Sequence, residues 1–311
     1  MGRYIIRRVL FLIPTLLAIV FIVFGIMSLT PNNPGAVILG IRGTPETIAE
    51  LNHQLGYDRP LIIRYGDYVL NLFKGSMGTS YITGRDVFSE ILSRFPTTVK
   101  LATLSIIIST TIGILLGIVT AVKQYSFFDI LSTSLAMFFA SMPSFWFGIM
   151  AILLFSLMLG LLPSNGLESW KHYILPAMTL ALAEAASILR LTRTTMLEAI
   201  RQDYVRTARA KGQSERKVIF RHALKNALLP VVTVIGMDFG WLLGGAVVIE
   251  QVFSINGVAK LIVEAIRMKD IPQVTGCALF LAFFFMLAML VVDILYAYID
   301  PRIKSRYQKL R

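Results

Sequence analysis

The sequence predicts an all-α membrane protein with about six transmembrane helices and a small external helical cap between the first two. Its 311 residues are 56% hydrophobic and only 15% charged, a composition too apolar for a typical soluble globular protein. A bilayer core requires roughly 20 consecutive apolar residues per helix. Segments that meet this requirement lie at 9–29, 99–122, 130–161, 173–196, 227–249 and 275–299.

The first segment follows Arg3, Arg7 and Arg8 and could be mistaken for a secretory signal. We expect it to be retained as a span, because Thr30-Pro31-Asn32-Asn33-Pro34 offers no small-x-small cleavage site. The third segment is long, and Pro143 inside it removes a backbone hydrogen bond. We therefore expect a single span there that tilts or kinks.

The segment 30–98 carries the predicted cap. Thr44 is a helix cap with Pro45 in the first turn, and the amphipathic run extends through Leu55 until Gly56 ends it. A second helix is expected at 60–73, a break at 75–80, and a third helix at 86–94 before Pro96. We accordingly divide the chain into 1–29, the tail and first span, 30–98, the extracytoplasmic cap, and 99–311, the membrane core with a cytoplasmic loop at 197–226.

The formal charge of +12 is distributed unevenly between the two sides of the membrane. Basic residues of short loops mark the cytoplasmic side, and here they occur at the N-terminus, at Lys123, in the loop 201–230 and at the C-terminal Arg302, Lys304, Arg306, Lys309 and Arg311. In the first and last outer loops the charges balance. We expect both termini in the cytoplasm of a multi-pass protein of the bacterial cytoplasmic membrane, and topology explains the excess charge without nucleic acid.

Small and ionisable residues within the spans indicate how the helices meet. Ser109, Gly113, Gly117 and Ala121 share one helix face, and Gly236, Gly240 and Gly244 share another, as close helix packing requires. Arg190 and Arg193 lie near a cytoplasmic end, where they can snorkel, and Asp293 lies near the inner end of the last span. Glu184 and Asp238 either pair across helices or line a polar cavity.

Catalytic and metal-binding patterns are missing from the sequence. The single cysteine is Cys277, and His53, His172 and His222 lie in three different loops, so neither a disulfide within the chain nor a metal site is expected. No G-x-x-x-x-G-K-S/T, H-E-x-x-H or G-x-S-x-G motif occurs. The chain is expected to bind no cofactor and to hydrolyse nothing itself, so a partner would supply energy for any work.

The loop 201–230 is the most distinctive segment of the chain. Eight basic residues there face only Asp203 and Glu215. A helix is expected from Asp203 to Lys211, a sharp turn at Gly212, and a second short helix capped by Ser214 with Glu215 at its first position. Apolar and basic side chains mix in that second helix, which suits either a groove on a soluble partner or an anionic lipid surface. The apolar ones are Val218, Ile219, Phe220, Ala223 and Leu224, and the basic ones are Lys217, Arg221 and Lys225.

Two runs in this loop, D-Y-V-R-T-A-R-A-K-G from Asp203 and R-H-A-L-K-N-A-L-L-P from Arg221, resemble the dipeptide, oligopeptide and nickel permeases of ATP-binding cassette (ABC) importers. Arg206 stands where the general motif E-A-A-x-x-x-G of importer permeases has Glu. The resemblance extends to Gly75-Ser76-Met77-Gly78, to Ser141-Met142-Pro143-Ser144-Phe145-Trp146 and to Asp300-Pro301-Arg302.

This resemblance implies the transmembrane domain of a type I ABC importer. It further implies a second permease subunit, expected to be a different chain, one or two ATPase subunits that use ATP and Mg, and an extracytoplasmic substrate-binding protein. The loop would couple to an ATPase subunit through Arg206, Ala208, Gly212, Ser214, Glu215, Val218, Ile219, Phe220, Arg221 and His222. From span position and polarity, we expect Met142, Phe145, Glu184, Asp238 and Gly240 along the translocation path.

Di- or oligopeptides are the expected cargo, with nickel or another small solute as the alternative. A different class, a secondary transporter driven by an ion gradient, would show internal repeats, and no convincing repeat relates the two halves. Only Glu184 and Asp238 could serve it as ion-coupled carboxylates. An intramembrane enzyme would need a nucleophile and base, and no such pair is evident.

Overall fold

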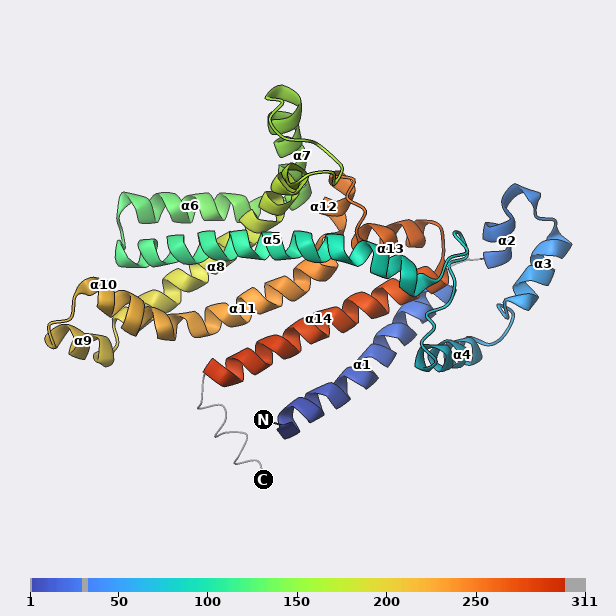
Figure 1. The fold of residues 1–311 in the computed structure, drawn as a ribbon, viewed down its shortest axis with the longest axis horizontal. Helices are drawn as coiled ribbons and strands as arrows, with labels where there is room; N and C mark the ends of the chain where they lie inside the picture. The colour runs from blue at the N-terminus through green and yellow to red at the C-terminus, as the bar shows by residue number, and fades with distance from the viewer. Residues whose placement is uncertain (1, 30–32, 300–311) are drawn as a thin grey trace. The chain divides into compact units, whose positions relative to one another are not determined.

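A computed structural model describes residues 2–29 and 33–299. Apart from one isolated bridge between Thr79 and Asp86, the regular structure of these residues is helical (Figure 1), which confirms the all-α class. Among the described residues, five helices are long and apolar enough to cross a membrane, or six if one bent pair is counted as a span. Two segments used in the sequence analysis lie outside the described residues. They are Thr30-Pro31-Asn32, where no cleavage site is expected, and the basic C-terminal segment from Asp300 to Arg311.

The chain forms two compact units, one of Met1–Val99 with Asn256–Met286, and one of Lys100–Ile255 with Leu287–Arg311. We call them unit 1 and unit 2. The long helices α5 and α14 each contribute residues to both.

Unit 1 contains the N-terminal span and the predicted cap. Its helices are α1 (Gly2–Leu29), α2 (Pro34–Leu39), α3 (Pro45–Gln54), α4 (Leu61–Phe73), the start of α5 (Val87–Val122), α13 (Val258–Arg267) and the start of α14 (Ile271–Ile299), with a 3₁₀ turn at Gly40–Arg42. The predicted cap of α3 is confirmed: the Thr47 amide donates to Thr44 Oγ1 at 3.3 Å, and the Thr44 amide donates to Thr47 Oγ1 at 2.9 Å. At Gly56 the backbone has φ +65°, which lets the chain turn away after α3.

The predicted break at Pro96 is wrong, because α5 continues through it for 36 residues. The helix begins where expected, since Asp86 Oδ2 accepts hydrogen bonds from the Ser89 amide at 2.8 Å and its hydroxyl at 2.9 Å. Proline removes one hydrogen bond of the helix, but fully buried Val87 and Ile91 anchor the turns before it. Packing therefore outweighs the local cost of the proline.

A buried aspartate joins two distant segments of unit 1. Asp270, 2% exposed, precedes α14 and accepts hydrogen bonds from the Ser80 hydroxyl at 2.5 Å and the Tyr81 amide at 3.1 Å. These bonds hold the irregular segment before α5 against the start of α14. Apolar side chains from α1, α4, α13 and α14 then close a core around Phe24, Met27, Ala265, Ile271 and Val274.

Unit 2 is built around α8 (Ile174–Ile200), which packs against α6 (Phe127–Ser141), α7 (Ser144–Ala151), α11 (Leu224–Gly245) and α12 (Val247–Val252). Further elements are α9 (Asp203–Ala210), α10 (Glu215–Lys217), two π-helical segments at Ile152–Met158 and Val218–Ala223, and a 3₁₀ turn at Trp170–Tyr173. The predicted small-residue face of α5 is confirmed. A Cβ added at Gly117 would lie 2.5 Å from Thr192 Cβ, and one at Gly113 would lie 2.7 Å from Ile188 Cβ.

The tilt or kink expected in the third segment, 130–161, is a sharp break. The chain breaks between α6 and α7, and the two helical parts are bent by 101°. A residue before proline is disfavoured in helical conformation, and Met142 is extended with ψ 133° while Pro143 opens α7. The proline therefore divides the segment instead of kinking it.

The second glycine face is confirmed only in part. A Cβ added at Gly236 would lie 1.9 Å from Val292 Cγ2, whereas one at Gly244 would meet nothing within 4 Å. Close approach of α11 and α14 in unit 2 thus depends on Gly236 and not on Gly244.

Candidate functional site

The basic loop between α8 and α11 has the predicted helix and turn. After α8 the chain forms α9 and then reverses at Gly212, where φ is +73°. The Gly212 amide donates to the Arg209 carbonyl at 2.9 Å and the Gln213 amide to the Ala208 carbonyl at 3.3 Å. These bonds use carbonyls left free at the helix end, and they require a residue that tolerates positive φ.

The predicted second short helix is instead the first part of a much longer one. Residues 215–245 run without interruption through α10, the π-helical segment and α11. The Ser214 side chain makes no capping bond, contrary to the prediction. Arg209 holds the helix start, because its Nε lies 2.7 Å from Glu215 Oε1 and its Nη2 lies 3.3 Å from Glu215 Oε2. The same hydrogen bond raises the pKa of Arg209 above its ordinary value.

The loop packs tightly on the ends of two spans. Buried Val205, Ala208, Val218 and Ala223 form one cluster with Ile118, Ala121, Met196, Ala199 and Ala227. The apolar side chains predicted as one docking face of the second helix therefore do not all point outwards. Val218 and Ala223 point into the protein, and Ile219 and Leu224 are partly buried against the same cluster. The basic loop is therefore attached to the ends of α5 and α8 through a buried apolar cluster.

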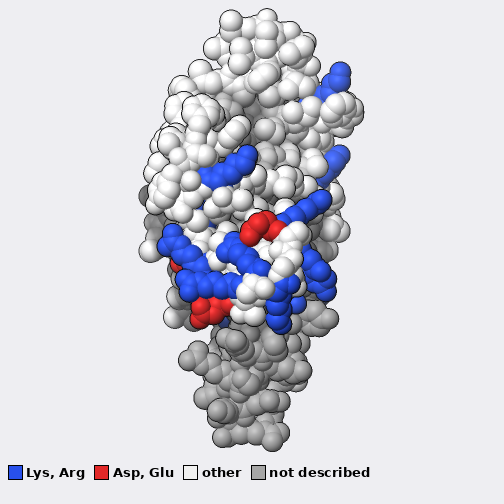
Figure 2. All heavy atoms as spheres, turned by 90° about the vertical axis from the view of Figure 1, so that its left-hand side faces the viewer, with Lys and Arg blue, Asp and Glu red and all other residues white. Residues whose placement is uncertain are grey.

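The outward side of the loop is a basic surface with one aromatic residue. Phe220 is 53% exposed and lines a shallow, open depression with Ser214, Arg216, Lys217 and Arg221. Figure 2 shows Lys and Arg side chains gathered over this end, with few Asp or Glu among them. His222 is half-buried, and its Nε2 lies 2.7 Å from Gln213 Oε1. Arg206 is exposed, with Nη1 3.6 Å from Asp203 Oδ1.

Two of the expected pathway residues come together in unit 2. The side chains of Glu184 on α8 and Asp238 on α11 lie close enough to interact. Asp238 Oδ2 is buried and, within the described residues, has no hydrogen-bond partner. Gly240 is buried on the same helix as Asp238. Met142 and the half-exposed Phe145 lie at the break between α6 and α7, on different elements from the carboxyl pair.

An ion pair between spans was missed in the sequence. Asp129 is buried on α6, and its Oδ1 and Oδ2 lie 2.7 and 2.8 Å from Arg193 Nε and Nη2 on α8. Arg193 therefore does not snorkel, whereas Arg190 is exposed. The available signal was Asp129 as an acid within an apolar segment, three residues after the helix cap Ser126.

These helices have the fold of the transmembrane domain of an ABC importer, as comparison with solved structures shows. The inward-facing MetNI methionine ABC transporter matches with a TM-score of 0.59 and 16% identity, over 68% of this chain and 97% of that chain. The predicted type I importer fold is thus confirmed.

The chain belongs to the family of binding-protein-dependent transport system inner membrane components, which matches residues 113–305. The N-terminal component of such systems matches residues 1–102. The glutathione transport system permease protein GsiC of Salmonella typhimurium (strain LT2) is 41% identical over 306 residues, 98% of this chain and 100% of its own length. A putative peptide transport system permease protein of Brucella abortus (strain 2308) is 42% identical over 312 residues, 98% of this chain and 99% of its own.

Proposed function

We propose that the chain is the permease subunit of an ATP-driven importer for di- or oligopeptides and forms half of the translocation path. The observation that carries the proposal is the basic loop, attached on one side to two spans and presenting Phe220 among Arg216, Lys217 and Arg221 on the other. The names of the relatives, peptide and glutathione permeases, support a peptide-like cargo. A nickel complex or another small solute is the alternative within the family.

The proposed assembly supplies what this chain lacks. A second, different permease subunit forms the other half of the path, and one or two cytoplasmic ATPase subunits bind ATP and Mg. An extracytoplasmic binding protein delivers the cargo to the cap. Both termini and the basic loop lie in the cytoplasm, in agreement with the positive-inside rule.

Coupling follows from the continuity of the helix. An ATPase cleft that receives Phe220 and pairs its acidic groups with Arg216 and Arg221 would move the start of this helix when ATP closes the cleft. Because residues 215–245 form one helix, the displacement reaches Asp238 and Gly240. The carboxyl pair with Glu184 lies on the helix that moves, and we place it, with Met142 and Phe145, along the path.

The test separates docking from folding. Phe220→Ser and Arg221→Glu change exposed side chains, whereas deletion of the loop would also remove buried Val218 and Ala223. We expect both variants to insert normally, to lose co-purification with the ATPase subunit and to lose most ATP-driven uptake in proteoliposomes. Ile41→Ser alters an exposed residue of the cap and serves as the control.

Unchanged ATP-driven uptake by both loop variants would contradict the proposal. Uptake that followed an imposed proton or sodium gradient without ATP would favour the secondary transporter instead.

A further inference from the structure

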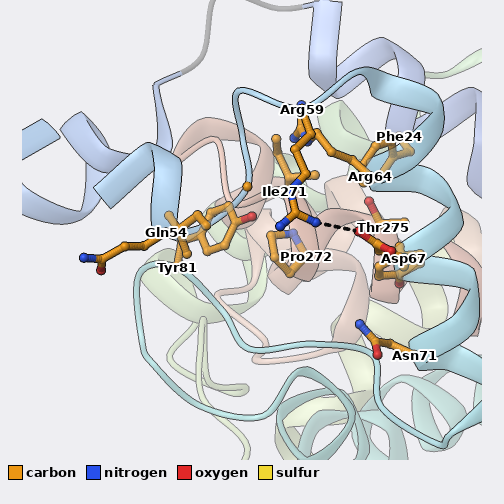
Figure 3. Close-up of a pocket in the computed structure, with 13 residues that line it drawn as sticks. Phe24, Gln54, Arg59, Arg64, Asp67, Asn71, Tyr81, Ile271, Pro272 and Thr275 are labelled. Carbon is orange, nitrogen blue, oxygen red and sulfur yellow. Dashed lines mark hydrogen bonds and ion pairs between the residues drawn. The ribbon is translucent and has the colours of Figure 1, made fainter. Parts of the chain in front are cut away.

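Unit 1 contains a pocket of about 280 Å³, and no residue of the basic loop or of the carboxyl pair lines it. It lies among the turn between α3 and α4, the exposed face of α4, the segment before α5 and the start of α14 (Figure 3). Its polar lining includes Arg59, Arg64, Asp67, Tyr68, Tyr81 and Thr275.

The pocket presents both signs of charge with one positive charge in excess. Arg59 Nη1 lies 3.3 Å from Asp67 Oδ2, and both side chains are more than half exposed. The Arg64 guanidinium lies over the Tyr57 ring at 3.9 Å and over the Phe24 ring at 5.3 Å. Within the described part of the chain, no carboxylate forms an ion pair with Arg64. Stacking fixes its plane and leaves edge N–H groups that suit a carboxylate.

Two hydroxyl groups of the lining lack hydrogen bonds. Tyr68 Oη and Thr275 Oγ1 are both buried, and neither has a partner among the described residues. Thr275 itself is 0% exposed. Burial raises the pKa of Tyr68 and of Tyr81, so both phenols stay neutral. Neither the Tyr68 nor the Thr275 oxygen has accessible surface, so these two hydroxyls belong to the wall behind the pocket and do not reach a ligand in it.

The pocket is partly open, so its volume indicates how much of a ligand it encloses. At about 30 Å³ for each water-sized group, the volume accommodates on the order of ten non-hydrogen atoms. A free amino acid has this size and carries one group of each charge.

We propose that this pocket binds a free amino acid, with its carboxylate at Arg64 and its ammonium group at Asp67. Asp67 engages Arg59 through one oxygen and has the other for the ammonium group. Binding at this pocket does not require that the chain imports its cargo, or that ATP rather than an ion gradient drives transport.

The proposal is tested by calorimetric titration of the full-length chain in lipid nanodiscs with the common amino acids at millimolar concentration. We expect saturable binding of at least one of them, and weaker binding of acetate or methylammonium, which each carry only one of the two charges. Arg64→Gln and Asp67→Asn should each weaken it at least about tenfold, because hydrogen bonds to charged groups are lost. Arg42→Gln, outside the pocket, should leave the affinity unchanged.

A second measurement separates ligand binding from folding. Asp67→Asn changes a side chain that is more than half exposed, so the Tm of the free protein should change little while its amino-acid affinity falls. The proposal is overturned if no amino acid binds, if acetate binds equally well, or if binding survives Arg64→Gln. Crosslinking of the pocket to a binding protein without any amino-acid binding would identify a protein occupant instead.

Discussion

The pairing of Asp129 with Arg193 joins two spans of unit 2 through a two-pronged contact. Asp129→Asn would leave the Arg193 guanidinium without its charged partner, although the side chain of Arg193 is 24% exposed and can reach some water. We expect a loss of about 1–3 kcal/mol in the free energy of unfolding. Thermal unfolding in nanodiscs measures it, with Arg190→Gln as the control. Equal Tm values for the two variants would contradict a stabilising role.

A hydrogen bond between the side chains of His53 and Asp58 in the cap provides a second test. His53 Nδ1 lies 2.8 Å from Asp58 Oδ2, and this hydrogen bond raises the pKa of His53 above its ordinary value of 6.5. The contact therefore favours the folded cap fully below that ordinary value, and the contribution disappears as the pH rises through the raised pKa. NMR titration of the labelled histidines should place the His53 midpoint above 6.5. Asp58→Asn should lower it, and Glu46→Gln should not.

At the scale of elements, two glycines of α11 provide a matched comparison. Gly236→Ala would place a methyl group against Val292, a stiff β-branched side chain, whereas Gly244→Ala would meet open space. We expect Gly236→Ala to cost about 1–3 kcal/mol through overpacking, and Gly244→Ala to be neutral or slightly stabilising. Equal stability of the two variants would show that α11 and α14 do not approach so closely.

The sequence correctly predicted the helix caps and turns that depend on only a few neighbouring residues. Thr44 with Pro45, Gly56 and Gly212 specify caps and turns through a few neighbouring atoms, and the structure has each of them. Sequence reasoning failed at Pro96 and underestimated the effect of Pro143. Pro96 lies inside a helix held by buried neighbours, while Pro143 divides one, and only the tertiary packing distinguishes them.

The candidate site likewise has some features that the sequence could predict and others that it could not. The basic character and the turn of the loop could be predicted, because residue type determines charge and glycine favours a positive φ. The inward orientation of Val218 and Ala223 could not, since the π-helical segment changes which side chains share a face. The partner of Arg193 was likewise outside the reach of sequence spacing, because Asp129 lies 64 residues away.

For the whole molecule, the single cysteine provides a test of the proposed orientation. Cys277 is fully buried, so the wild-type chain should not react with a membrane-impermeant maleimide. Ile41→Cys and Tyr204→Cys place thiols at exposed positions of the cap and the basic loop. In intact spheroplasts we expect labelling of Ile41→Cys alone, with Tyr204→Cys reacting only after permeabilisation. The reverse pattern would invert the topology.

The π-helical segment Val218–Ala223 also bears on how this chain tolerates changes of length. A π turn contains one residue more than an α turn, so deletion of Phe220 can convert the segment to regular α-helix while the residues on either side keep their angular phase. The same deletion inside α11 would rotate one half of the span by about 100° against the other. Homologous chains that lack this one residue should therefore keep Asp238 turned towards Glu184.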